Sequence, residues 1–175
     1  RSLMVGAVSA TDTGSEDIIS GVDAVPLEIT DNDVYTTGES SFYKLNDEIK
    51  NTAESLDLNQ DYALNNETDN KNGIVIAKDN FVLNGNGRTI DGKNQSRIFN
   101  ITANNVTLSN LILTGGNANK GGAIYATGLL TLNNVTFIDN YASQNGGAVE
   151  IYGDAALNCN NRSRSEERRV GKECR

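Results

Sequence analysis

The sequence predicts an all-β protein that folds as a right-handed parallel β-helix, a solenoid with about 25 residues per coil and a short capping helix on its N-terminal side. The main observation is a repeat, because five leucines recur at intervals of 25, 25, 24 and 25 residues. Within each interval, apolar and polar residues alternate over short segments, as in strands that bury one face. The leucines are Leu58, Leu83, Leu108, Leu132 and Leu157.

Two further columns follow the same period. The residues two positions before the leucines are all apolar: Leu56, Phe81, Val106, Leu130 and Ala155. The residues one position after them are all small and polar: Asn59, Asn84, Ser109, Asn133 and Asn158. Because parallel strands of successive coils lie ~4.8 Å apart, equivalent side chains stack on one another. The sequence therefore predicts an internal leucine stack and an amide ladder of Asn59, Asn84, Asn133 and Asn158.

One repeat holds three short strands and three corners. In the third full repeat the strands are expected at 123–125, 130–132 and 135–137. Asn133-Asn134 joins the last two strands, and such a corner needs left-handed backbone, which Asn tolerates better than other non-glycine residues. A leucine-rich repeat is the alternative architecture, since Leu132-x-x-Val135-x-Phe137-x-x-Asn140 fits its strand signature. That fold would need a helix or an extended return after the Asn, whereas another apolar column follows here.

A short amphipathic helix precedes the repeats. Phe42, Leu45, Ile49 and Ala53 have helical spacing, and Ser40-Ser41 stands where an N-cap belongs, which predicts a capping helix near 42–53. Residues 11–40 are acidic and lack any apolar period, so we expect a disordered lead. The β-helix with its helix is predicted to occupy 41–163.

Both ends of the sequence are interpreted separately. Residues 1–10 are apolar and end in Val8-Ser9-Ala10, the small-x-small form of a signal-peptidase site, which indicates a signal-peptide remnant. Residues 164–175 read RSEERRVGKECR, the translation of a common sequencing-adapter oligonucleotide, and we interpret them as an artefact. Because this tail interrupts the repeat soon after Leu157, we expect a fragment truncated on its C-terminal side.

Composition excludes several functional classes. The chain carries 15 Lys+Arg, 23 Asp+Glu and no His, with a formal net charge of -8. Without His there is no His-based triad or metal site, and the acidic balance argues against nucleic acid or anionic lipid as a partner. We expect no cofactor, no metal site and no transmembrane segment. With the tail excluded, Cys159 is expected to be a lone, small buried side chain.

Three stretches resemble known β-helical families. The motifs 121–124 (GGAI) and 146–149 (GGAV), with 137–140 (FIDN) between them, resemble the GGA(I/L/V) and FxxN motifs of polymorphic outer-membrane protein repeats. The segment 84–92 (NGNGRTIDG) resembles the opening coil of pectin-lyase-like right-handed β-helices, and 42–158 is similar to adhesin-like surface proteins of methanogenic archaea. The resemblance implies a secreted or surface-displayed β-helix that mediates attachment.

The enzymatic alternative is a β-helical polysaccharide lyase or glycoside hydrolase. Glycoside hydrolysis needs two carboxylates at one sugar bond. The candidates are Asp91, Asp139, Glu150 and Asp154, but no pair falls in columns that would bring them together. A lyase acting on polyuronate would also need a basic residue, and Arg88, Lys93, Arg97 and Lys120 are scattered along the coils. We therefore predict no catalytic residues.

The remaining motifs concern the outer surface. Glycosylation sequons make Asn66, Asn94, Asn100 and Asn105 candidate acceptors, whereas Asn134 is expected to be a corner residue although it also matches. The predicted function is non-catalytic attachment at the cell surface, with repeated polar columns contacting a surface glycan or a host or neighbouring cell. An enzyme fragment and an inert structural stalk are the alternatives.

Overall fold

The computed structural model describes residues 40–66, 69 and 71–160. The predicted signal-peptide remnant, the predicted disordered lead up to residue 39 and the adapter-like tail lie outside the described residues. The described part contains one helix and twelve strands, and it is nearly all-β. The elements are α1 (Phe42–Asn51), β1 (Ser55–Asp57), β2 (Tyr62–Ala63), β3 (Ile74–Ile76), β4 (Val82–Asn84), β5 (Thr89–Ser96), β6 (Phe99–Ile101), β7 (Val106–Lys120), β8 (Ile124–Ala126), β9 (Leu130–Ile138), β10 (Tyr141–Asn145), β11 (Val149–Ile151) and β12 (Leu157–Asn160).

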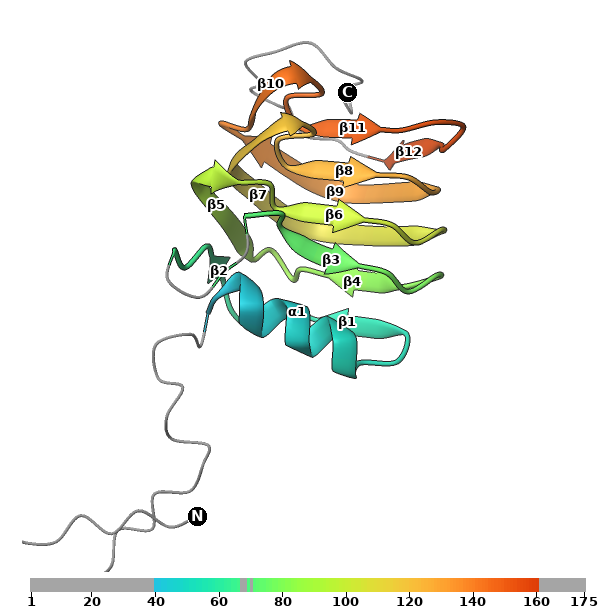
Figure 1. Cartoon of the computed structure of the whole chain (residues 1–175). Coiled ribbons are helices and arrows are strands. Elements are labelled where there is room, and N and C mark those ends of the chain that lie inside the picture. The colour runs from blue at the N-terminus through green and yellow to red at the C-terminus, as the bar shows by residue number, and fades with distance from the viewer. Residues whose placement is uncertain (1–39, 67–68, 70, 161–175) are drawn as a thin grey trace, which may run out of the picture. The chain divides into compact units, whose positions relative to one another are not determined.

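The strands of successive coils stack in parallel, as Figure 1 shows. One sheet has four strands in the order β11-β8-β6-β3, and the other has eight strands built around β1-β4-β7-β5-β2, with β9, β10 and β12 attached. Every pairing between named strands is parallel. This arrangement confirms the predicted parallel β-helix, whereas its right-handedness stays a prediction. The leucine-rich repeat is wrong, because the segment after Asn140 forms β10 and β11 instead of a helix or an extended return.

The leucines of the middle coils form one interior file, as predicted. Leu83 pairs with Leu108, and Leu108 pairs with Leu132. All three side chains are fully buried. Burying such a side chain contributes about 1.5–3 kcal/mol, and each coil supplies part of the surface that buries the next.

The predicted register fails at both ends of this file. Leu56, not Leu58, pairs with Leu83, and Cys159, not Leu157, pairs with Leu132. The end repeats are therefore 27 residues long. A strand has a side-chain period of two, so a shift of two residues keeps the same face inward and leaves the apolar pattern unchanged.

The same shift changes the polar column. Asp57 pairs with Asn84, and Asn160 pairs with Asn133, so these two residues replace the predicted Asn59 and Asn158. Asn84 and Asn133 hold the predicted places, with Ser109 between them.

Cys159 also differs from its prediction. It lies half-buried on β12 and is disulfide-bonded, so it is not a lone thiol.

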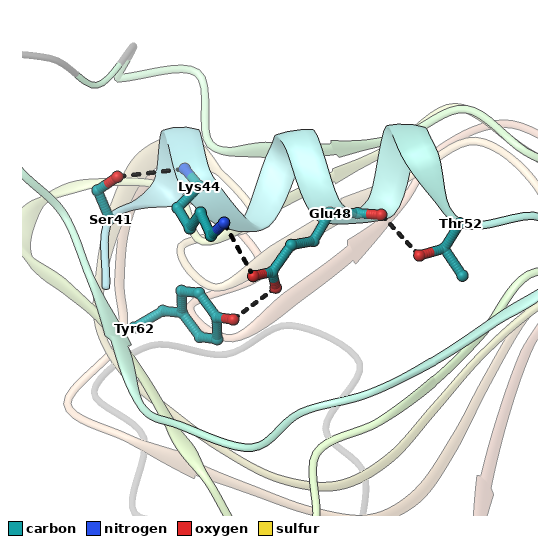
Figure 2. Close-up of polar contacts among 5 residues, drawn as sticks. All are labelled: Ser41, Lys44, Glu48, Thr52 and Tyr62. Atoms are coloured by element: carbon teal, nitrogen blue, oxygen red, sulfur yellow. Dashed lines mark hydrogen bonds and ion pairs between the residues drawn. The ribbon is translucent and has the colours of Figure 1, made fainter. Parts of the chain in front are cut away.

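Helix α1 confirms the predicted cap and ends two residues earlier than expected. Ser41 is the N-cap, and its hydroxyl oxygen accepts a hydrogen bond from the Lys44 N–H at 3.2 Å (Figure 2). Its apolar face, formed by Phe42, Leu45 and Ile49, is buried in the core. Ala53 lies beyond the helix and is exposed.

Side chains from two other segments bind the ends of α1. The Asp69 carboxylate accepts hydrogen bonds from the N–H groups of Phe42 and Tyr43, at 3.0 and 2.7 Å. At the other helix end, the Lys78 ammonium donates to the carbonyl oxygens of Ile49 (3.1 Å), Lys50 (2.8 Å) and Thr52. An acid at the N-terminus and a base at the C-terminus both complement the helix dipole.

The helix also provides a hydrogen-bond acceptor for β3, the edge strand of the four-stranded sheet. The Asn46 side-chain oxygen accepts a hydrogen bond from the Val75 N–H of β3 at 2.7 Å. An edge strand presents unpaired N–H groups, and covering them limits pairing with another chain. In Figure 1, α1 lies across the end of the stack formed by β1 and β3.

Candidate functional site

Corner asparagines form a column along the outside of the solenoid. Asn86, Asn110 and Asn134 have left-handed φ values of 52°, 53° and 53°, which Asn tolerates well. This confirms Asn134 as a corner residue, although the corner bends β9 without interrupting it.

The amides of this region bond in one direction. The Asn134 Nδ2 donates to the Asn110 Oδ1 at 3.0 Å, and the Asn110 Nδ2 donates to the Asn84 Oδ1 at 3.0 Å. The Asn84 Nδ2 then donates to an Asp57 carboxylate oxygen at 2.7 Å. A carboxylate can only accept, so Asp57 fixes the direction of the whole chain of amides. We call Asn134, Asn110, Asn84 and Asp57 the amide chain.

The candidate glycosylation acceptors occupy different environments. Asn66 and Asn94 are exposed, and Asn94 has a left-handed φ of 58°. Asn100 lies half-buried on β6. The Asn105 Nδ2 already donates to the Asn80 side-chain oxygen at 2.7 Å. Attaching a sugar to this nitrogen would therefore compete with a hydrogen bond between two coils.

The carboxylates that an enzyme would need occupy separate places. Asp91 lies on β5, where one carboxylate oxygen is 2.9 Å from the Lys93 ammonium. Glu150 lies on β11 in the other sheet, whereas Asp139 and Asp154 are exposed outside the strands. In residues 40–66, 69 and 71–160, no group of three His, Cys, Asp or Glu side chains could hold a metal ion.

The asparagine of the FxxN motif is a buried structural residue. Asn140 is 1% exposed, and its side-chain oxygen accepts from the Gly116 N–H at 2.8 Å. Its Nδ2 donates to the Leu113 carbonyl oxygen at 2.9 Å, which ties it to the coil below. A Cβ on Gly116 would lie 2.3 Å from the Gly122 carbonyl oxygen and 2.7 Å from the Asn140 side-chain oxygen, so this position of the preceding repeat has no room for a side chain.

Two tyrosines and two cations gather on the outer face of the four-stranded sheet. The rings of Tyr125 and Tyr152 lie 6.2 Å apart, centroid to centroid, and are tilted by 32°. The Arg97 guanidinium lies 5.1 Å from the Tyr125 ring centre, and the Lys120 ammonium lies 6.0 Å from that of Tyr152. These are cation–π distances. Across the described ranges, no other ring pair or cation–π contact occurs.

Arg97 is fixed by the coil above it. Its Nε donates to the Gly121 carbonyl oxygen at 3.2 Å, and its Nη2 donates to the Lys120 carbonyl oxygen at 2.7 Å. Partial burial lowers the pKa of Arg97 from its ordinary value, and the facing Tyr125 opposes this shift. The guanidinium, held by these two hydrogen bonds, lies over the Tyr125 ring.

Sequence reasoning did not find this cluster. Arg97 and Lys120 looked scattered, and the 25-residue period places Tyr125 beside Glu150, with which it pairs. Tyr152 is two residues further along the outer face. The sequence does hold one signal for the cluster. The two basic residues, Arg97 and Lys120, and the two tyrosines, Tyr125 and Tyr152, are each separated by one coil length to within two residues.

Comparisons with protein-family models, with curated proteins and with solved structures gave no match to this chain. The resemblances noted in the sequence therefore rest on their motifs and on the β-helix itself. Among the described residues, no helix has the length and apolar character needed to cross a bilayer.

Proposed function

We propose that the chain is part of an extracellular, surface-displayed attachment protein without catalytic activity. The observation that carries this proposal is the repeated separation of an apolar interior from a polar exterior along the solenoid. The same apolar columns fill the interior of successive coils, and small polar side chains recur on the outside at Asp57, Asn84, Ser109, Asn133 and Asn160. Repetition of weak contacts along a rigid stack gives multivalent binding to a periodic surface.

The polar exterior supports a glycan or a cell surface as the target. The amide chain presents donors and acceptors at each coil, and sugar hydroxyl groups also donate and accept hydrogen bonds. The acidic balance of the chain disfavours anionic polymers, which points to a neutral target.

A binding assay with the intact chain tests the proposal. The chain is attached in many copies to fluorescent beads and exposed to an array of neutral and anionic glycans and to whole microbial and animal cells. Retention of the coated beads, compared with beads carrying an unrelated acidic protein, is the expected result.

The two alternatives give different outcomes. Release of reducing ends or of unsaturated sugar products from a polysaccharide would favour the lyase or hydrolase. Failure to bind any glycan or cell would favour the inert stalk and contradict the proposal.

A further inference from the structure

The outer face of the four-stranded sheet differs from the rest of the surface. Its outward column runs Val75, Asn100, Tyr125 and Glu150 through β3, β6, β8 and β11. Tyr152 follows β11 and is 57% exposed, and its N–H donates to the Ala126 carbonyl oxygen at 2.9 Å. We call Arg97, Lys120, Tyr125, Glu150 and Tyr152 the tyrosine face.

The tyrosine face is preorganised. Arg97 is held by two carbonyl oxygens and lies over Tyr125, and Tyr125 lies beside Tyr152. Each member comes from a different place in the coils, so strand register sets their spacing. A site whose side chains are already ordered loses less conformational entropy when a ligand binds.

Lys120 provides a donor that the fold does not use. Its ammonium has no hydrogen-bond or ion-pair partner among the described residues, and it lies near the exposed ring of Tyr152. Glu150 provides an acceptor on the same sheet face. The face therefore combines an aromatic surface, a donor and an acceptor.

This combination matches a sugar ring. A pyranose has apolar C–H groups that pack against an aromatic ring, whose face is the negative part of its quadrupole. Its hydroxyl groups accept from an ammonium and donate to a carboxylate. An anionic sugar fits less well, because Glu150 shares the face and the chain carries a net charge of -8.

We infer that the tyrosine face binds a neutral, pyranose-containing glycan, with Tyr152 as the main packing surface and Lys120 as a donor. The inference rests on the proposed attachment function and names its target class and contact residues. Tyr125 and Arg97 act by positioning Tyr152 and Lys120.

Affinity electrophoresis of the intact chain in gels containing single polysaccharides tests the inference. The neutral probes are hydroxyethyl cellulose, galactomannan and xyloglucan, and the anionic probes are polygalacturonate and dextran sulfate. We expect retardation by at least one neutral probe that persists in 0.5 M NaCl, since salt screens only charge–charge attraction.

Matched variants then locate the site. Tyr152→Ala is expected to raise the Kd for that probe about fivefold, and Lys120→Gln about threefold, from the usual strengths of aromatic and hydrogen-bonded contacts. Tyr43→Ala removes a tyrosine that is 63% exposed on α1, and Lys93→Gln removes a cation on β5. Both controls are expected to bind like the unmodified chain, and circular dichroism checks the fold of all four variants.

The outcomes separate the inference from the proposed function. If the chain binds glycans or cells but Tyr152→Ala and Lys120→Gln bind as tightly as the unmodified chain, the inference is wrong and attachment stands. Binding only to the anionic probes, with loss in 0.5 M NaCl, also overturns the inference. If the unmodified chain binds none of the probes and no cell, both fail.

Discussion

The middle coils and the helix-capped end stabilise the same solenoid by different means. In the middle coils, interior side chains pack on equivalent side chains of the next coil, as Leu83, Leu108 and Leu132 do. At the capped end the described residues form no further coil, and side chains outside the repeat pattern, such as Asp69 and Lys78, supply the hydrogen-bond partners. The comparison teaches that repetition provides packing, whereas an end needs residues specific to it.

This difference predicts where substitutions should be most costly. Close-packed backbone and buried polar groups in the coils have no room to adjust, so single changes there should have large effects. The capped end divides its stabilisation among several partly exposed hydrogen bonds, so single changes there should have smaller effects.

Gly122→Ala should have the largest effect. A Cβ at this position would overlap the carbonyl oxygens of Gly147 and Tyr141, which belong to the backbone and cannot move aside. We expect a loss of about 4 kcal/mol in the free energy of unfolding, or no folded protein, measured by urea unfolding and soluble yield.

Gly87→Ala is the control for this prediction. A Cβ there meets open space and is opposed only by a left-handed φ of 79°, which costs roughly 1–2 kcal/mol. Equal losses for the two variants would show that backbone crowding between coils is not the cause.

Asn140→Ala should be the next most costly change. It leaves the buried Gly116 N–H and Leu113 carbonyl without this partner, which we expect to cost about 3 kcal/mol in urea unfolding. Asn133→Ala removes an amide from a half-exposed position and should cost less than about 1 kcal/mol. If both variants lost the same stability, the buried hydrogen bonds of Asn140 would contribute no more to stability than a half-exposed surface amide does.

Lys78→Met tests the capped end. The variant keeps the aliphatic part of the side chain and removes the ammonium that bonds the carbonyl oxygens at the end of α1. We expect the free energy of unfolding, measured by urea titration, to fall by about 1–2 kcal/mol. Lys71→Met, at an exposed position, should change little, and a loss as large as that of Asn140→Ala would break the comparison.

Tyr62→Phe should have the smallest effect at neutral pH, about 1 kcal/mol. The Tyr62 hydroxyl donates to a Glu48 carboxylate oxygen at 2.6 Å (Figure 2). Burial and this hydrogen bond raise the pKa of Tyr62 from 10.0 to about 12. The fold favours the neutral phenol, so its contribution is complete below pH 10 and is lost as the pH rises through 12.

Urea unfolding at pH 8 and at pH 11 measures this change. The stability difference between the unmodified chain and Tyr62→Phe should shrink at pH 11. Tyr43→Phe alters an exposed ring on α1 and controls for the loss of a phenol. A difference that stays constant between the two pH values would contradict the assignment.

The sequence predicted the coils well because their features are local and repeated. Leu83, Leu108 and Leu132 identify the interior file, and Asn134 identifies a corner that needs left-handed backbone. The helix was predictable for the same reason, since Ser41 and the apolar spacing of Phe42, Leu45 and Ile49 lie close together in the sequence.

The ends and the surface cluster were harder to predict. Leu56 and Leu58 both satisfy the apolar pattern, and only pairing with Leu83 distinguishes them. The contact between Arg97 and Tyr125 joins two coils through a long side chain, whose direction no repeat pattern specifies. Periodicity therefore predicts which residues face outward, but not which of them meet.

The one-way order of the amide chain limits how such a molecule can be lengthened. A new layer placed between Asn84 and Asn110 must offer a side chain that both donates and accepts a hydrogen bond, as Asn or Ser does. Asp57 can only accept, so it ends the amide chain within the described residues. Duplicating a middle layer would preserve this order, whereas duplicating the layer that contains Asp57 would set a carboxylate where a donor is required.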